Sequence, residues 1–131
     1  MSQVSIQKEK DFQKFFTQAI KYLWWWIHKM PDVWNFRKPF DAFVSYKWHI
    51  KAVELKIANT HKTNVLRLLK DHQIENLKQL YPNAYVVCYF KKEKATSLYK
   101  MQPNWELMEI VNLKRLLEVC DYLLWINSKH S

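Results

Sequence analysis

Apolar residues in the first thirty positions recur at intervals of three and four. Ser5 stands where a helix N-cap would, and the series ends at Pro31. This spacing predicts one amphipathic helix over 6–30. Three consecutive tryptophans, Trp24 to Trp26, would then cover roughly 300° of the helix circumference. At least one ring must therefore leave the main core face, which suggests a second packed layer or a partner subunit.

Four short segments rich in β-branched and aromatic residues predict strands. Residues 39–46 and 49–57 follow each other closely and would form a hairpin. Residues 84–90, AYVVCYF, are apolar almost throughout, as is typical of a strand buried on both faces. Residues 95–101 predict a strand at the edge of the sheet.

Two further helices complete the predicted elements. Residues 64–80 carry leucines at helical spacing and stop before Pro82, and 106–126 predict a final helix interrupted near Asn112. The order helix, strands, helix, strand, helix is typical of an α/β fold with a mixed β-sheet flanked by helices.

The chain has 131 residues, of which 49% are apolar. This is enough for a single domain over 1–131 and too apolar for a disordered tail. No apolar run approaches the about 20 residues that cross a membrane, and the polar N-terminus predicts no secretion signal. Two cysteines are too few for a disulfide framework. We therefore expect a cytoplasmic protein without a membrane segment.

Basic residues outnumber acidic ones by 21 to 12, which gives a formal net charge of +9. Residues 1–100 hold 18 Lys and Arg against 8 Asp and Glu, whereas 101–131 hold 3 against 4. Such a concentrated excess favours a polyanionic partner, and nucleic acid is the commonest one. A lysine-rich protein that binds no polyanion is the alternative.

The predicted hairpin brings acidic residues together. If Lys47-Trp48 forms its tip, the numbers of paired residues sum to 95, so that Asp41 lies opposite Glu54, with Cβ atoms about 4.5–5.5 Å apart. Lys56 points to the same face. Two carboxylates at about 5 Å repel by roughly 3 kcal/mol at an effective dielectric near 20. Mg²⁺ would offset that repulsion, because one or two carboxylates and a phosphate suit this hard ion.

This pattern predicts metal-dependent phosphodiester hydrolysis, in which Lys56 contacts a phosphate oxygen or acts on the attacking water. Glu54-Leu55-Lys56 is the one acid-x-Lys triplet of the chain, although such a spacing also arises by chance. Lys47-Trp48 is not the Asn-Gly sequence that two-residue turns favour, and a three-residue loop without a bulge would shift the register. A structural role for the acids is the alternative.

Two segments resemble a nuclease family. Pro39-Phe40-Asp41, followed after twelve residues by Glu54-Leu55-Lys56, resembles the motif of the PD-(D/E)xK nucleases. The run NVLRLLKDHQIENLKQL over 64–80 resembles more narrowly the RecU-type Holliday junction resolvases, in which a His-Gln pair opens a helix behind the active site. The resemblance implies a restriction-endonuclease-like fold of the αβββαβ type.

The same resemblance assigns roles to residues of this chain. It implies that Asp41 and Glu54 are metal ligands, that Lys56 is the catalytic lysine and that Gln73 supports the active site. Glu9 is a looser match to the acid that many of these nucleases place in the first helix, where it would be a further metal ligand. Glu9 shares a helix face with Gln13, toward the expected sheet.

We therefore expect an Mg²⁺-dependent endonuclease, with Mn²⁺ as a substitute ion, that cuts branched DNA in recombination and repair. A homodimer is expected because two sites related by a two-fold axis would cut two strands symmetrically. A flap, end-processing or restriction nuclease and a non-catalytic DNA-binding module are the alternatives. The candidate DNA contacts, whose alternative is an ordinary solvated surface, are Thr60, His61, Lys62, Lys70, Lys91 and Lys92.

Overall fold

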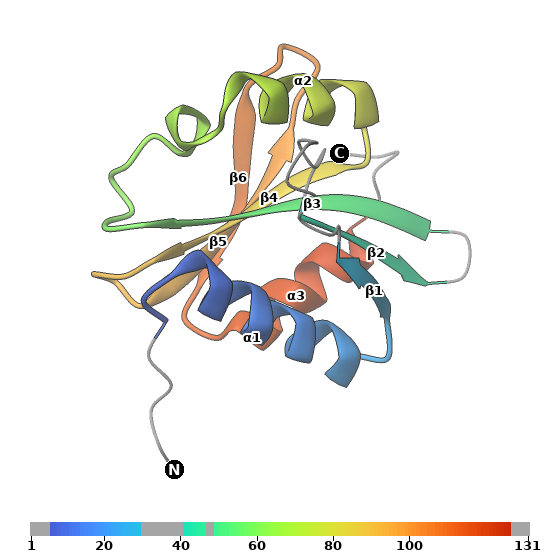
Figure 1. Cartoon of the computed structure of the whole chain (residues 1–131), viewed down its shortest axis with the longest axis vertical. Helices are drawn as coiled ribbons and strands as arrows, with labels where there is room; N and C mark the ends of the chain where they lie inside the picture. Colours follow the sequence, from blue (N-terminus) through green and yellow to red (C-terminus); the bar gives the residue numbers. More distant parts are fainter. Residues whose placement is uncertain (1–5, 30–40, 47–48, 127–131) are drawn as a thin grey trace.

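Six strands form one mixed sheet in the computed structural model, which describes residues 6–29, 41–46 and 49–126 (Figure 1). The strands lie side by side in chain order. They are β1 (Trp26–Lys29), β2 (Ala42–Tyr46), β3 (His49–Ala58), β4 (Ala84–Phe90), β5 (Ala95–Met101) and β6 (Leu107–Leu113). β3 and β4 run parallel, and the other neighbouring pairs are antiparallel.

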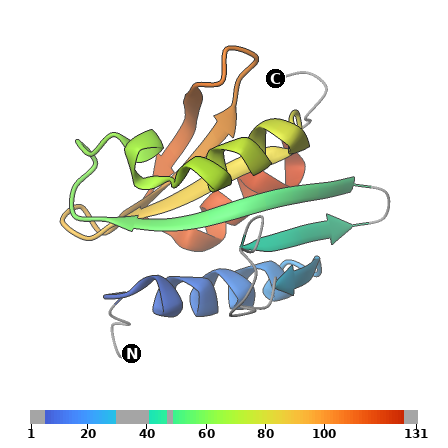
Figure 2. The same ribbon diagram turned by 45° about the horizontal axis from the view of Figure 1, so that its top comes forward.

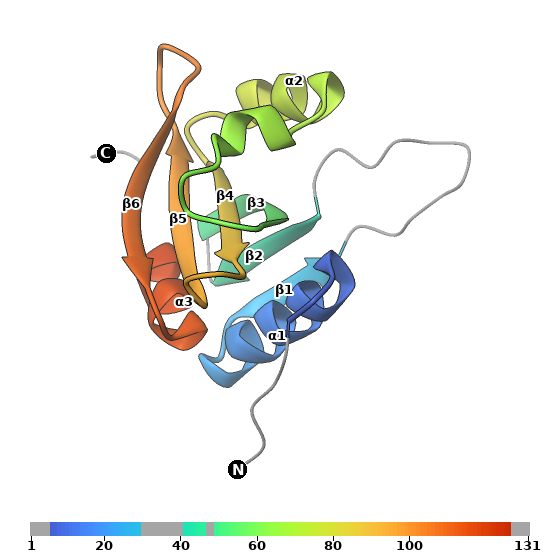
Figure 3. The same cartoon turned by 90° about the vertical axis from the view of Figure 1, so that its left-hand side faces the viewer.

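Helices cover both faces of this sheet. α1 (Glu9–Tyr22) and α3 (Leu116–Trp125) lie on one face, and α2 (Asp71–Leu80) lies on the other (Figures 2 and 3). Buried side chains such as Phe16 and Leu123 form the core beneath α1 and α3, and a second core beneath α2 includes Leu77 and Phe90. The predicted α/β fold with a mixed, helix-flanked sheet is confirmed. Within the described ranges, no helix is long and apolar enough to span a bilayer.

The first helix is shorter than the predicted 6–30, because α1 ends at Tyr22. Trp24 adopts a left-handed φ of 67°. The N–H groups of Trp24 and Trp25 then donate to the carbonyls of Lys21 and Ile20, at 3.0 and 3.2 Å. This is a Schellman motif, with tryptophan at a position that glycine usually takes. The chain continues as the edge strand β1, so the prediction of one uninterrupted helix is wrong.

The three tryptophans have different environments. Trp25 is buried and packs edge-on against Trp125, with ring centroids 6.0 Å apart. Trp24 and Trp26 are 86% and 70% exposed. The expectation that at least one ring leaves the core is confirmed, although the cause is a turn and a strand rather than the circumference of a helix.

The predicted helix over 64–80 is two helices. A 3₁₀ helix, η1, covers Val65–Leu68, and α2 begins at Asp71. The Asn64 side chain accepts a hydrogen bond from the Leu66 N–H at 3.1 Å and caps η1. Lys70 has an extended backbone, which separates the two helices.

The last predicted helix is wrong in its first half, which forms β6 instead. Leu98 pairs with Val111 and Tyr99 pairs with Glu109, so Ile110 is an extra residue at a β-bulge. The bulge interrupts the two-residue alternation that would have identified a strand. Because β6 pairs with β5, β5 is an internal strand buried along its length and not the edge strand that its sequence suggested.

Candidate functional site

The β2–β3 hairpin has the register that the sequence arithmetic predicts. Its pairs run from Ala42 with Val53 to Tyr46 with His49, so that the paired numbers sum to 95. The Asp41 N–H donates to the Val53 carbonyl at 3.2 Å, so Asp41 lies against β3 directly before β2 begins. Residues 39–40 and 47–48, which hold the start of the motif and the hairpin tip, lie outside the described residues. Asp41 is therefore next to Glu54 at the open end of the hairpin.

The Asp41 carboxylate binds the backbone of β3 beside the last residue pair of β2 and β3. β3 continues to Ala58, past the start of β2, and the Leu55 N–H donates to Asp41 Oδ2 at 2.7 Å. The other oxygen, Oδ1, accepts from the side-chain amide of Gln13 on α1 at 3.3 Å. Asp41 is only 7% exposed. Its carboxylate is thus held within the site from two directions.

Glu54 is held from the opposite face of the sheet by Gln73 on α2. The Gln73 amide nitrogen donates to Glu54 Oε2 at 3.1 Å. The Gln73 amide oxygen accepts from the Lys70 N–H at 2.9 Å, so the first turn of α2 fixes which end of the amide faces Glu54. Glu54 is 2% exposed. The break between η1 and α2 therefore places a glutamine against a buried carboxylate.

Lys56 lies two residues beyond Glu54 on β3 and contacts the first helix. Its ammonium nitrogen is 3.8 Å from Glu9 Oε1, and Glu9 is about half exposed.

Cys88 is the β4 partner of Lys56 in the parallel register. Burial raises the pKa of the Cys88 thiol to about 12, and Glu9 contributes to the rise. This thiol is therefore neutral near pH 7.

The structure thus brings the predicted catalytic residues together in one place. Asp41, Glu54 and Glu9 as anions and Lys56 as a cation sum to a charge of −2, which a divalent ion would balance. No three His, Cys, Asp or Glu side chains of the described ranges gather closely enough to form a metal-binding group. Two carboxylates suffice for Mg²⁺, which keeps several of its waters. Asp41 and Glu54 fit that ion, whereas Glu9 as a third ligand stays a prediction.

Gln13 is a site residue whose contact was not predicted. Its position four residues after Glu9 placed it on the correct helix face, but nothing in the sequence pointed to Asp41, 28 residues further along the chain. The general signal is a polar side chain on the inward face of an amphipathic helix, between the buried Phe12 and Phe16.

Two of the predicted DNA contacts take part in a network within the protein. Thr60 Oγ1 donates to Glu93 Oε2 at 2.8 Å, and the His61 N–H donates to Glu93 Oε1 at 3.0 Å. The His61 ring contacts Glu109 Oε2 at 2.5 Å. These bonds attach the loop after β3 to the β4–β5 turn and to β6, so both side chains support the loop.

The four predicted lysine contacts lie at the surface. Lys62, Lys70 and Lys92 are exposed, and Lys91 is partly exposed. The N–H groups of Lys91 and Lys92 donate to the carbonyls of Ala58 and Asn59, at 3.0 and 2.8 Å. The β4–β5 turn thus lies against the end of the strand that carries Lys56. Their contact with DNA stays a prediction.

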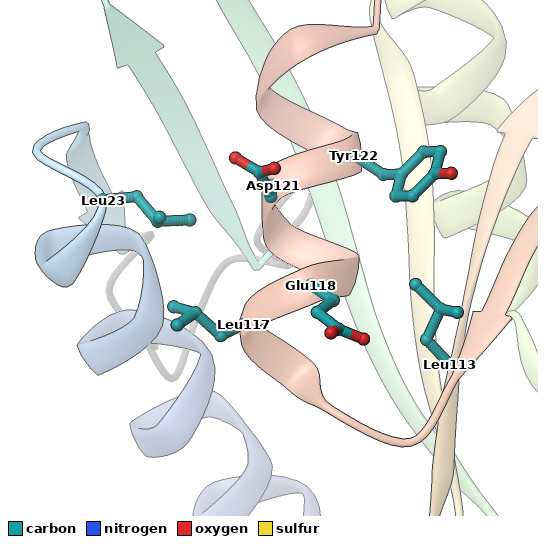
Figure 4. Close-up of a pocket in the computed structure, with 6 residues that line it drawn as sticks. All are labelled: Leu23, Leu113, Leu117, Glu118, Asp121 and Tyr122. Atoms are coloured by element: carbon teal, nitrogen blue, oxygen red, sulfur yellow. The ribbon is translucent and has the colours of Figure 1, made fainter.

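An open cavity of about 580 Å³ along α3 contains none of these residues (Figure 4). The carboxylates of Glu118 and Asp121 line this cavity and would repel a phosphate backbone, so the cavity does not suit a nucleic acid. It is lined by Leu23, Leu113, Leu117, Glu118, Asp121 and Tyr122.

A solved structure with the same architecture is the Holliday junction resolvase Hjc from the archaeal hyperthermophile Archaeoglobus fulgidus. It superimposes with a TM-score of 0.54 at 14% sequence identity, over 77% of this chain and 86% of that one. The chain has a restriction-endonuclease-like fold. The predicted αβββαβ core corresponds to α1, β1, β2, β3, α2 and β4. No protein-family model and no curated protein sequence matches the chain.

Proposed function

We propose that this protein is a metal-dependent DNA endonuclease that acts on branched DNA as a Holliday junction resolvase. The observation that carries the proposal is the meeting of Asp41, Glu54 and Lys56 at the open end of the β2–β3 hairpin. The fold that the chain shares with an archaeal resolvase supports the same class of substrate, and so does the net charge of +9.

Asp41 and Glu54 are the residues that would hold the metal. Bound Mg²⁺ would supply charge neutralisation at the scissile phosphate and a more acidic water. The amides of Gln13 and Gln73 orient the two carboxylates without neutralising them. Both acids are nearly inaccessible to bulk water, which strengthens their attraction for a cation.

Lys56 is the proposed catalytic lysine. Its ammonium can contact a phosphate oxygen as a point charge or, once deprotonated, accept a proton from the attacking water. The ion pair with Glu9 keeps the long side chain near the carboxylates before substrate arrives. Glu9 is about half exposed, so an incoming phosphate can replace it as the partner of Lys56.

Four surface lysines would bind the DNA backbone. Lys62, Lys70, Lys91 and Lys92 all lie on segments joined to β3 or to the start of α2. Phosphate contacts of this kind position a duplex without reading its sequence. A homodimer acting in the cytoplasm completes the proposal, because two sites related by a two-fold axis would cut a junction symmetrically.

Cleavage of a panel of labelled DNA substrates tests this function. With Mg²⁺, the full chain should cut a four-way junction in preference to a flap, a duplex or a single strand of the same sequence. Glu54→Gln should abolish the cleavage, and Glu75→Gln, which changes an exposed acid on α2, should leave it unchanged.

The other outcomes identify the alternatives. Cleavage of the flap or duplex in preference to the junction would assign the chain to another nuclease type of the same fold. Salt-sensitive binding without turnover on any substrate would instead support a non-catalytic DNA-binding module, in which the acids are structural.

A further inference from the structure

Gln13 approaches the proposed metal-binding carboxylate of Asp41 from α1. Its amide nitrogen lies 3.3 Å from Asp41 Oδ1, while the Leu55 N–H occupies Oδ2 at 2.7 Å. The two donors come from different elements, a helix and a strand. Together they restrain the rotation of a carboxylate that is 7% exposed.

The core fixes the position of Gln13 itself. Its neighbours on α1, Phe12 and Phe16, are fully buried in the core between α1, α3 and the sheet. The Thr17 hydroxyl donates to the Gln13 carbonyl at 2.7 Å within the same helix. Gln13 therefore stands on a rigid support, as a group that orients a metal ligand needs to.

The neutral charge of the amide matters as much as its position. A lysine or arginine at this place would pair with Asp41 and compete with a cation, whereas an amide donates a hydrogen bond and leaves the negative charge intact. Gln73 stands in the same relation to Glu54, from the opposite face of the sheet. Each buried acid thus receives one hydrogen bond from a glutamine.

We propose that Gln13 is a positioning residue, which holds the Asp41 carboxylate in the orientation that binds a divalent cation and preserves its charge. The inference rests on the proposed function and deepens it. Partners of this kind that orient a metal ligand typically account for a factor of 10 to 100 in metal affinity.

Binding of Mn²⁺ to the full chain, followed by electron paramagnetic resonance without DNA, tests the inference. Gln13→Met removes the donor at similar volume and should weaken Mn²⁺ binding about 10-fold. Gln13→Lys retains a donor but adds a positive charge, and should weaken binding further. Gln18→Met, an exposed position on the same helix, is the matched control and should bind as the wild type does.

A second readout separates positioning from a merely structural role. Raising the Mg²⁺ concentration should restore junction cleavage in Gln13→Met but not in Asp41→Asn, because only the latter lacks a ligand. Wild-type Mn²⁺ affinity in folded Gln13→Met would overturn the inference. If that variant does not fold, wild-type affinity in Gln13→Lys overturns it.

Asp41→Asn distinguishes this failure from failure of the proposed function. Loss of Mn²⁺ binding in Asp41→Asn, with full binding in both Gln13 variants, rejects the role of Gln13 alone. A wild-type chain that binds no Mn²⁺ rejects the metal site and, with it, the inference.

Discussion

Two buried lysines on β3, Lys51 and Lys56, have opposite surroundings. The Lys51 ammonium donates to the carbonyls of Leu123 and Ile126, both at 2.5 Å, at the C-terminal end of α3. Lys56 follows Glu54 by two residues on β3, and its ammonium lies near the carboxylate of Glu9 on α1. Burial alone therefore does not identify a catalytic lysine in this protein. The partners distinguish the two lysines, since carbonyls at a helix end suit a structural cation, whereas carboxylates at the open end of the hairpin suit the proposed catalytic role.

Removal of the Lys56 ammonium should have the largest effect on cleavage among the lysine substitutions. Lys56→Met should reduce junction cleavage by about 10²- to 10⁴-fold, the range of a general acid–base or charge contribution. Its ion pair with the half-exposed Glu9 contributes about 1 kcal/mol or less to stability. Single-turnover cleavage and urea unfolding measure the two effects, and a large loss of stability without a loss of rate would reverse the assignment.

The same substitution at the other lysine should have the opposite result. Lys51→Met leaves the carbonyls at the end of α3 without a donor and should lower the free energy of unfolding by about 1–3 kcal/mol. Cleavage per folded molecule should stay at the wild-type rate, because Lys51 contacts none of the site residues in the described part of the chain. Loss of cleavage in a folded Lys51→Met protein would contradict the comparison.

The lowered pKa of Lys51 should also make the free energy of unfolding depend on pH. Burial, followed by the charge of Lys100, lowers the pKa of Lys51 from 10.5 to about 8. The unfolded chain then binds more protons than the folded one above pH 8, so the Lys51 contribution to unfolding free energy rises there by up to about 1.4 kcal/mol per pH unit. Cys88, whose pKa is raised from 9.0, acts in the opposite direction above pH 9.

The difference between wild type and Lys51→Met cancels the cysteine contribution. Denaturant unfolding of both proteins at pH 7, 8 and 9 should show the difference growing in favour of the wild type above pH 8. A difference that is constant over this range would show that Lys51 has an ordinary pKa in the folded protein.

The smallest effect is expected at a solvent-exposed lysine. Lys62→Ala should weaken DNA binding by a similar factor for all sequences and reduce the slope of the salt dependence by about 1. His61→Ala should leave that slope unchanged, because its ring pairs with Glu109. Filter binding or fluorescence anisotropy at several salt concentrations distinguishes the two variants.

Local patterns predicted the parts of the fold whose partners are close in sequence. The hairpin register followed from arithmetic on a two-residue tip, and it is correct although the chain has no glycine. The strand over 84–90 is confirmed with its bounds unchanged, because a buried run between turn residues has few alternatives.

The errors arose where a residue takes an unusual conformation or a distant partner. Trp24 ends α1 in a left-handed conformation that tryptophan seldom adopts, so no residue preference indicated the stop. The bulge at Ile110 concealed β6. The role of Lys51 depends on α3, more than seventy residues away, and becomes visible only when the sheet brings them together.

In the candidate site too, residues close in sequence could be predicted together, whereas contacts between distant elements could not. Asp41, Glu54 and Lys56 could be placed together from the hairpin alone. Gln73 was predicted only from the resemblance of its segment to a family motif. It contacts Glu54, which precedes it by 19 residues in the sequence. The contact of Gln13 with Asp41 depends on how α1 packs against the sheet. The helical pattern indicates which face of α1 points inward, but not which residue that face contacts.

Asp41 and Glu54 are proposed to support metal-dependent cleavage of a DNA junction. The most direct test of this role is single-turnover cleavage of a labelled four-way junction with Mg²⁺, by the wild type and by Asp41→Asn. We expect cleavage by the wild type that EDTA abolishes, and no cleavage by Asp41→Asn despite unchanged junction binding. Equal cleavage by the two proteins would contradict this role.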